Sequence, residues 1–472
     1  MGGHAVRWTA EQVMALAPDD ASRRAGSKLS APGPWSEAGT GIGAVWGLCK
    51  GSGKKPYQTV VDLDGGQGPG YKCSCPSRKF PCKHAVGLLL LWAGGDAAVA
   101  EEDKAPEWAD GWLSGRRERA TRATSRASGG AGAEEAGGGD GAPSEQQRAA
   151  ARQRAERRHA RIAAGAEELE QRLADLLRGG LAGAGQAGYA TWDEMAARMV
   201  DAQAPGLASR IRELGAIPAS GEGWPGRLLA ECALLHLLDQ GFLRLDTLPE
   251  PLAATVRGRV GLTVDAAELL ADEKARVRDE WLVLAQRDSE EGRLTARRIW
   301  LYGRASGRHA LLLSFGAAGR APELALPVGT SLDADLAFYP GARPLRAALG
   351  ERHGPPAPGF VPEGGAVPDA LAAYASGLAA DPWLDGWPAV LRDVVPVPPA
   401  GADGSPVSRT AGWTLAAADE DVALPLAPGT SDTALWKLAA ISGGGPVTVF
   451  GEHGHRGFAP HTTWSDGRAV PL

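Results

Sequence analysis

Three of the five cysteines in this 472-residue chain are close together, at Cys73, Cys75 and Cys82, and a histidine, His84, follows the last of them. Their spacing is C-x-C-x6-C-x-H. Three thiolates and one imidazole form a complete tetrahedral ligand set for Zn²⁺, and closed structural sites of this kind have no open coordination position. We therefore predict a structural zinc site at these four residues and expect no zinc-dependent hydrolysis there.

The cysteine cluster has two alternative explanations besides zinc binding, namely burial without a function and redox chemistry. The thiols could be packed as small hydrophobic groups, or the C-x-C pair could form a redox-active disulfide. Four side chains of metal-ligating type beside basic residues argue against chance burial, and the nearby C-x-H favours metal over redox chemistry. Of the two remaining cysteines, Cys49 lies on a predicted strand and Cys232 in an apolar helix, so we interpret both as packed hydrophobic side chains.

Two strands and a helix are expected to bring the four ligands together. Residues 44–50, "AVWGLCK", and 57–63, "YQTVVDL", are rich in β-branched and aromatic residues, and "GSGKKP" between them has the composition of a hairpin loop. Alternate side chains of a strand point to the same face, so both thiols of C-x-C reach one ion. The apolar run "AVGLLLLWA" after His84 predicts a short buried helix.

This order of motif and elements resembles the SWIM zinc finger, a ββα module with a C-x-C-x(n)-C-x-H signature. The resemblance extends from about Val45 to Trp92, and the apolar helix after His84 fits it. It implies a zinc-binding module that recognises DNA or a protein. Bacterial SWIM proteins are often encoded beside MoxR-type AAA ATPases and von Willebrand A-domain proteins, so the resemblance also implies such an assembly as a partner.

Basic side chains and one aromatic ring surround the predicted ligands, and no acidic residue lies between Tyr71 and Trp92. Cations suit phosphate contact and an aromatic ring suits base stacking. The same cations would also offset the surplus negative charge that three thiolates leave on Zn²⁺, and the sequence leaves both roles open. The residues predicted to contact nucleic acid or a partner are Lys72, Arg78, Lys79, Phe80 and Lys83.

The rest of the chain divides by composition, and the predicted fold class is α+β multidomain. Residues 1–100 form the zinc-stabilised ββα module, and residues 101–147 form a low-complexity, flexible linker that would let the finger move independently of the body. Residues 148–275 are helical by propensity, with Pro and Gly between segments, which predicts a helical bundle. Residues 276–472 form a mixed α/β region.

Strand and helix patterns alternate in that last region. "EWLVLAQRD", "RRIWLYGRA" and "HALLLSFG" predict successive antiparallel strands. Residues 345–354, "LRAALGERHG", and 368–382, "PDALAAYASGLAADP", predict helices. From Gly412 onward, "GWTLAAA", "VALPL" and "PVTVFGEHGHRGFAPHTTW" predict further strands.

Two weaker signals involve basic residues and histidines. Arg154, Arg157, Arg158 and Arg161 fall on one face of the predicted helix that starts at residue 148; such a face touches nucleic acid or an acidic partner, or is simply solvated. "HGHR", which starts at His453, could bind a metal together with His461, although histidines in Gly-rich loops are more often solvated. The catalytic patterns G-x-S-x-G and H-E-x-x-H do not occur.

The net charge of the chain and the length of its apolar runs restrict its location and its partners. A net charge of -6 gives the whole molecule no field strong enough to imply nucleic-acid or membrane binding, so any such partner must be argued from local residues. No run of eighteen apolar residues and no apolar core of signal-peptide length occurs, so we expect a soluble cytoplasmic protein with no membrane partner. Clustered cysteines in a reducing compartment favour metal binding over disulfides.

These observations favour a non-enzymatic, zinc-dependent interaction protein whose finger recognises DNA or a protein partner. The alternative is an enzyme, or an accessory subunit of one, with an unrecognised active site in residues 190–472. Convergent ionisable residues in a large pocket would distinguish the two.

Overall fold

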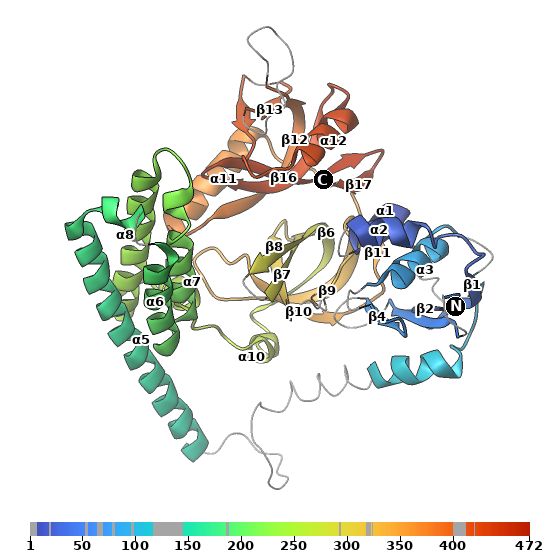
Figure 1. Cartoon of the computed structure of the whole chain (residues 1–472), viewed down its shortest axis with the longest axis horizontal. Helices are drawn as coiled ribbons and strands as arrows, with labels where there is room; N and C mark the ends of the chain where they lie inside the picture. Colours follow the sequence, from blue (N-terminus) through green and yellow to red (C-terminus); the bar gives the residue numbers. More distant parts are fainter. Residues whose placement is uncertain are drawn as a thin grey trace.

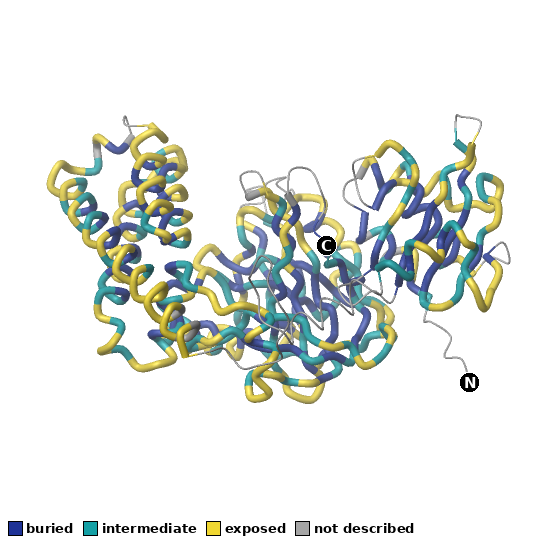
Figure 2. The backbone as a smooth tube through the Cα atoms, turned by 90° about the horizontal axis from the view of Figure 1, so that it is seen from below, coloured by how far each residue is buried: buried dark blue, intermediate teal, exposed yellow. Residues whose placement is uncertain are grey.

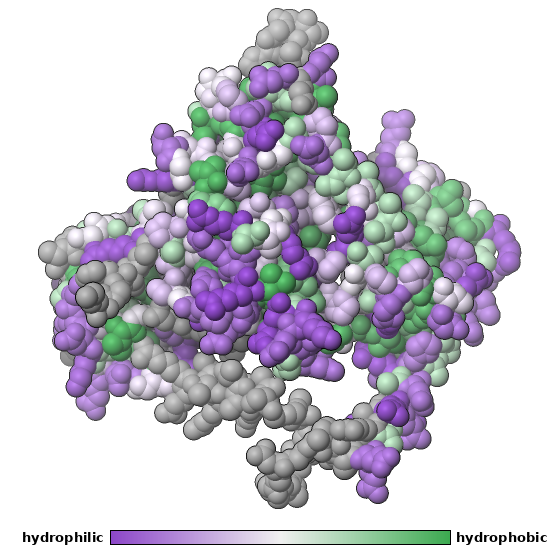
Figure 3. Space-filling view, turned by 180° about the vertical axis from the view of Figure 1, so that it is seen from behind, coloured by the Kyte–Doolittle hydropathy of each residue, from purple (hydrophilic) through white to green (hydrophobic). Residues whose placement is uncertain are grey.

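The computed structural model has an N-terminal module on one side, a helical bundle on the other and two β-sheets between them (Figure 1, Figure 2). Hydrophilic side chains cover most of the face in Figure 3, with hydrophobic patches among them. The predicted α+β multidomain fold class is confirmed. The structure describes residues 7–472 except 18–19, 52–54, 64–68, 78–80, 96–98, 117–144, 186–187, 292–293, 318–321, 323, 400–411 and 420.

The N-terminal module is built on a five-stranded sheet in the order β4-β3-β2-β1-β5. Helix α3 lies on this sheet, and α1 and α2 pack against α3. The cluster between these layers buries Val45, Val61, Leu88 and Trp92. The elements are α1 Ala10–Ala15, α2 Asp20–Ser27, β1 Trp35–Gly41, β2 Ala44–Cys49, β3 Tyr57–Asp62, β4 Gly70–Cys73, α3 Lys83–Ala93 and β5 Ala100–Glu101.

The predicted strands β2 and β3 and the helix α3 are confirmed, whereas β1 is an addition that the sequence pattern did not predict. Its sequence, "WSEAGTG", has few β-branched residues. It pairs with β2 through a tight turn in which Ile42 and Gly43 have φ angles of 45° and 70°. Positive φ at both central residues is typical of a type I′ hairpin turn, whose twist matches that of the paired strands.

The N-terminal part of the predicted linker, residues 101–147, contains a helix instead of low-complexity chain. Residues 107–116 form a helix that covers the second face of the sheet. Ala109 and Leu113 are fully buried there against Trp46, and Arg116 forms an ion pair with Asp62 at 2.9 Å. Apolar side chains four residues apart give this helix a stripe to bury, and the low-complexity composition starts only after it. Residues 117–144 lie outside the described part of the chain.

The middle region is helical, as predicted, and α5 is its longest helix. The buried cluster of this helical region includes Ile162, Leu169, Met199, Leu235 and Phe242. No helix in the described part of the chain combines the length and apolar character needed to cross a membrane. The elements are α5 Glu145–Gly179, η1 Leu181–Gly185, α6 Gly188–Asp201, α7 Pro205–Leu214, η2 Ile217–Ala219, α8 Trp224–Leu243, η3 Leu245–Thr247, α9 Glu250–Val260 and α10 Ala266–Ala271.

The C-terminal region contains two sheets, with strand orders β10-β9-β6-β7-β8 and β14-β13-β12-β15-β16-β17. Trp300 and Phe450 belong to a buried cluster that joins the sheets, and Trp383 belongs to the buried cluster of the bundle. The elements are β6 Arg276–Glu291, β7 Leu294–Gly303, β8 His309–Ala317, β9 Thr330–Phe338, β10 Ala347–Arg352, β11 Ala357–Pro358, α11 Val367–Ala380, β12 Gly386–Val397, β13 Thr414–Ala417, β14 Ala423–Pro425, α12 Asp432–Ser442, β15 Val447–Gly454, β16 Gly457–Ser465 and β17 Arg468–Pro471.

One of the two predicted helices in this region is wrong. Residues 345–354 contain strand β10, which pairs antiparallel with β9, whereas the predicted helix at 368–382 is confirmed as α11. Leucine and alanine favour a helix locally. Pairing along the open edge of β9 overrides that preference, because the strand gains backbone hydrogen bonds and buries Ala347 against the sheet.

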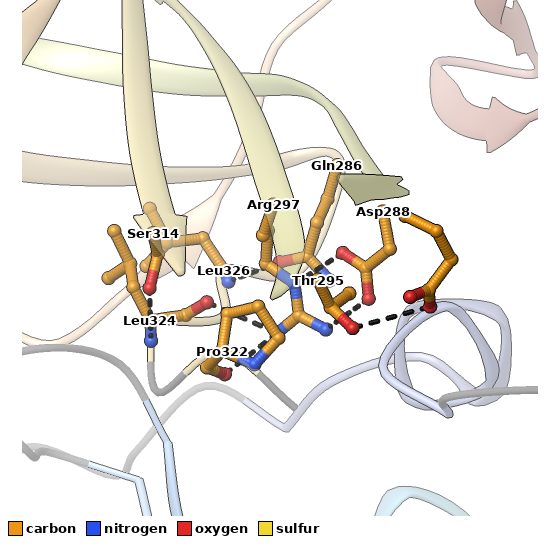
Figure 4. Close-up of polar contacts among 9 residues, drawn as sticks. Gln286, Asp288, Thr295, Arg297, Ser314, Pro322, Leu324 and Leu326 are labelled. Carbon is orange, nitrogen blue, oxygen red and sulfur yellow. Dashed lines mark hydrogen bonds and ion pairs between the residues drawn. The ribbon is translucent and has the colours of Figure 1, made fainter. Parts of the chain in front are cut away.

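The N-terminal module packs against the segment that leads into β9 of the first C-terminal sheet. Ala325 is 2% exposed and belongs to the same buried cluster as Val61 and Leu63 of the module. Its neighbour Leu324 accepts a hydrogen bond of 3.1 Å from the buried Arg297, which is paired with Asp288 through two contacts of 2.7 Å (Figure 4). This ion pair between the buried Arg297 and the exposed Asp288 positions the segment that touches the module, so the finger is docked on the body in this structure.

Replacing Ala325 with Asp should separate the module from the sheet, because a carboxylate would be buried in an apolar contact without a partner. We expect the radius of gyration from small-angle X-ray scattering to increase while the zinc content stays constant. Ala372→Asp, at an exposed position on α11, is the control and should leave the radius unchanged. An unchanged radius for Ala325→Asp would contradict docking through this contact.

The bundle contains a carboxyl group with an unusual environment. Asp239 on α8 is fully buried beside Glu170, and in the described part of the chain no N–H or hydroxyl group donates a hydrogen bond to its oxygens. Burial, followed by the nearby carboxylate of Glu170, raises the pKa of Asp239 from 3.8 to about 9. The folded protein therefore holds a proton that the unfolded chain releases above pH 4. The free energy of unfolding should then decrease as the pH rises from about 4 to about 9.

Asp239→Asn should remove this decrease, because the amide carries no charge at any pH in this range. We expect the variant to be more stable than the wild type near pH 8, by about 1–3 kcal/mol, and to gain little near pH 4. Urea unfolding followed by helical circular dichroism measures this difference. Asp246→Asn, at an exposed position, is the control. Parallel pH profiles for the wild type and Asp239→Asn would show that Asp239 is not the source of the decrease.

Candidate metal centre

The four predicted metal ligands lie together at one end of the N-terminal module. Cys73 ends β4, Cys75 follows it, Cys82 precedes α3, and His84 lies in the first turn of that helix. One ligand atom from each residue lies within 4.8 Å of the corresponding atoms of the other three. Nδ1 of His84 is 3.7 Å from Sγ of Cys73 and 3.9 Å from Sγ of Cys82.

These distances fit a tetrahedral zinc site. Zn–S bonds of about 2.3 Å and Zn–N bonds of about 2.1 Å place sulfur and nitrogen ligands roughly 3.6 Å apart. Three sulfurs and one imidazole nitrogen are also the donors that zinc prefers over magnesium or calcium. Because four protein ligands fill a tetrahedral shell, the metal here has a structural role, and none of its positions remains for water.

The pKa shifts of the clustered thiols favour a thiolate at this site, which suits a divalent cation. A hydrogen bond from Cys82 lowers the pKa of Cys73 to about 4; His84 and Thr59 contribute in the same direction, while burial opposes them. The contact with Cys73 raises the pKa of Cys82. One thiol therefore donates to a neighbouring thiolate, and a bound cation would take the place of that shared proton.

Strand pairing and ring packing position the ligands. Thr59 on β3 is directly opposite Cys73 on β4, and its Oγ1 lies 3.3 Å from the sulfur. The ring of Tyr57 packs against His84 with centroids 4.9 Å apart. Cys82 is the N-cap residue of α3, where the partial positive charge of a helix start stabilises a thiolate. The ββα arrangement thus orients both halves of the ligand set.

The other thiol near this site is not part of the ligand set. Cys49 at the end of β2 is fully buried, and burial, together with the charge of Cys73, raises its pKa to about 11. It stays protonated at neutral pH, so it acts as a small packed side chain, as expected. Cys232 is likewise 1% exposed in the core of the bundle.

The structure describes only some of the predicted contact residues. Lys72 on β4 and Lys83 at the start of α3 are exposed, whereas Arg78, Lys79 and Phe80 lie outside the described residues. Two further exposed lysines, Lys50 and Lys55, flank the β2–β3 turn at the same end of the sheet. The lysines of "KGSGKKP", residues 50–56, were a signal that could have identified this pair.

The histidines of the "HGHR" segment do not form a metal site with His461 in the described part of the chain. His461 contacts Glu452 at 2.9 Å and Arg287 at 3.2 Å, and His455 contacts Tyr374 at 2.9 Å. His453 and His461 are each 8% exposed. The expectation of solvated histidines was therefore wrong for His453 and His461, which lie on strands β15 and β16, whereas His455 in the turn between them is exposed.

Two family models match the chain. Residues 57–93, from β3 to the end of α3, match the model described as the SWIM zinc finger. Residues 157–260, from within α5 to the end of α9, match the model described as the SWIM-associated four-helix bundle domain. No curated protein and no solved structure matches the chain. The first match and the ligand geometry together confirm the predicted zinc.

Metal analysis of the purified full-length chain should give one zinc per molecule, and Cys75→Ser should lose it. Zinc binding contributes on the order of 10 kcal/mol to small modules of this kind. The variant should therefore also become sensitive to protease within residues 7–116.

Cys49→Ser is the matched control, because Cys49 is a cysteine of the same module that is not a ligand. It should keep one zinc per molecule. A wild type without stoichiometric zinc, or a Cys75→Ser module as resistant to protease as before, would contradict the assignment.

Proposed function

Because this chain is a SWIM domain-containing protein, we propose that its zinc finger contacts DNA through the metal-bearing end of the module. In this proposal the metal holds the fold and the surrounding cations bind backbone phosphates. No catalytic step is assigned to the chain, and the cytoplasm is its proposed location, where reduced thiols are available to bind zinc.

The observation that carries the proposal is the distribution of charge around the metal. Lys50, Lys55, Lys72 and Lys83 are exposed at this end of the module. A Zn(Cys)₃His centre has a net charge of about -1, so these four lysines exceed what the metal site needs for neutrality. The uncompensated positive charge favours a polyanion over an apolar or basic partner.

A protein partner is the competing possibility for the same finger. SWIM domains are generally interaction modules, and the family resemblance implies a MoxR-type AAA ATPase and a von Willebrand A-domain protein. The lysine distribution favours DNA over these proteins, because phosphates attract exposed cations without requiring a shaped apolar surface.

Fluorescence anisotropy with a short labelled DNA duplex tests the proposal. We expect the full-length protein to bind DNA at low salt. Lys72→Glu/Lys83→Glu should bind at least about tenfold more weakly, because it loses phosphate contacts, and its affinity should depend less on salt. A chelator should abolish the contribution of the finger. Zinc content is measured in each variant to exclude loss of the metal.

Lys274→Glu/Arg468→Glu, at two exposed positions outside the finger, is the control, because it changes the net charge by the same amount. If Lys72→Glu/Lys83→Glu and this control bind DNA equally well while both hold zinc, the finger does not contact DNA, and the protein partners become the leading candidates.

A further inference from the structure

The N-terminal half of α5 carries a row of arginines that neither the zinc site nor the finger uses. Arg154, Arg157, Arg158 and Arg161, the arginine ridge, follow one face of the helix at roughly 100° per residue. Arg154, Arg157 and Arg161 are exposed, and Arg158 is half-buried. This end of α5 extends beyond the other helices of the bundle (Figure 1).

The ridge differs from the arginines farther along α5 and on α6 because no carboxylate in the described part of the chain pairs with it. Within the described residues, none of the four forms an ion pair, and Arg158 donates only to the carbonyl oxygen of Gly261, at 3.1 Å. Farther along α5 and on α6, Arg172 and Arg198 both pair with Glu168, at 3.1 and 2.8 Å. Glutamates therefore compensate Arg172 and Arg198, whereas the described residues give the ridge no such ion pair, although Glu156 lies beside it.

A cavity of about 670 Å³ lies beside the ridge, where α5 passes the end of α9. The ring of His159 packs against Phe242 with centroids 4.9 Å apart, which holds this part of α5 against the bundle. Two ridge arginines therefore border a hollow large enough for a phosphate group. The residues that line the cavity are Arg154, Ala155, Glu156, Arg158, His159 and Leu262.

We propose that the arginine ridge binds the phosphate backbone of double-stranded DNA. From Arg154 to Arg161 the helix rises by about 10.5 Å at 1.5 Å per residue. One strand of B-DNA carries a phosphate about every 3.4 Å along the axis, so the ridge faces about three phosphates. Guanidinium groups also bind phosphate oxygens with two parallel hydrogen bonds.

This proposal adds a second DNA contact to the proposed function and does not depend on the zinc finger. The ridge lies on the bundle, outside residues 57–93 of the finger. The ridge would contact phosphates and no base edges, so it should bind DNA without sequence preference. An acidic protein surface is the competing occupant, and the experiment separates it from DNA.

The test uses full-length protein with Arg154→Ala, Arg157→Ala and Arg161→Ala combined. Arg158 is kept because it contacts Gly261 at the end of α9. The matched control is Arg212→Ala, Arg244→Ala and Arg468→Ala, which removes three exposed arginines elsewhere. Circular dichroism verifies that the helical content of both variants equals that of the wild type.

Anisotropy with a labelled duplex is recorded over a salt series, with and without Cys75→Ser. We expect the ridge variant to bind at least about tenfold more weakly and the slope of log K against log salt to fall by about 0.9 for each arginine removed. The control should bind like the wild type. Because the ridge effect should persist in Cys75→Ser, failure of the finger proposal leaves this result intact.

Three outcomes would overturn the ridge proposal. Equal binding by the ridge variant and the wild type would show that DNA does not touch these arginines. Equal loss in the ridge variant and the control would show that only total charge matters. Loss of binding to labelled polyglutamate without loss of binding to DNA would assign the ridge to an acidic protein.

Discussion

Four ligand atoms from the end of β4 and the start of α3 meet at one point, and the N-terminal module depends on that meeting. Residues 76–81 between the two pairs, Cys73 with Cys75 and Cys82 with His84, contain no strand or helix in the described part of the segment. A metal held by both pairs links the sheet to its covering helix and stabilises a module whose own core is small. Lys72 and Lys83 each directly precede a ligand in the sequence, Cys73 and His84, so the charged end of the module depends on the same ligands.

The module is also coupled to the rest of the molecule by packing. Tyr71, two residues before the first ligand, packs against the cluster that contains Ala325. The segment around Ala325 is positioned by Arg297, whose buried charge is compensated by Asp288 and by backbone carbonyl groups. A buried guanidinium group is costly unless its donors are satisfied; here Nε, Nη1 and Nη2 of Arg297 all donate hydrogen bonds. The zinc-binding module and the C-terminal sheet therefore meet at one interface, only two residues from the first metal ligand.

The distribution of charge matters more than its sum. The whole chain is mildly acidic, with a net charge of -6, yet exposed lysines gather at the metal-bearing end of the finger and unpaired arginines gather on α5. Charges farther apart than about 10 Å are largely screened at ordinary salt. Each basic surface thus acts on a nearby anion almost independently of the acidic residues elsewhere.

The sequence by itself determined the zinc ligands, the strands next to them, the helical middle region and most strands of the C-terminal sheets. These features depend on neighbours close in the chain: a ligand spacing, a period of two or a period of 3.6. Only the tertiary structure decided that residues 345–354 hold a strand, that residues 107–116 cover the finger's sheet, that Ala325 contacts the module and that Asp239 is buried beside Glu170. Each of these depends on a partner distant in sequence, whose packing or pairing energy exceeds the small local preferences that a sequence pattern records.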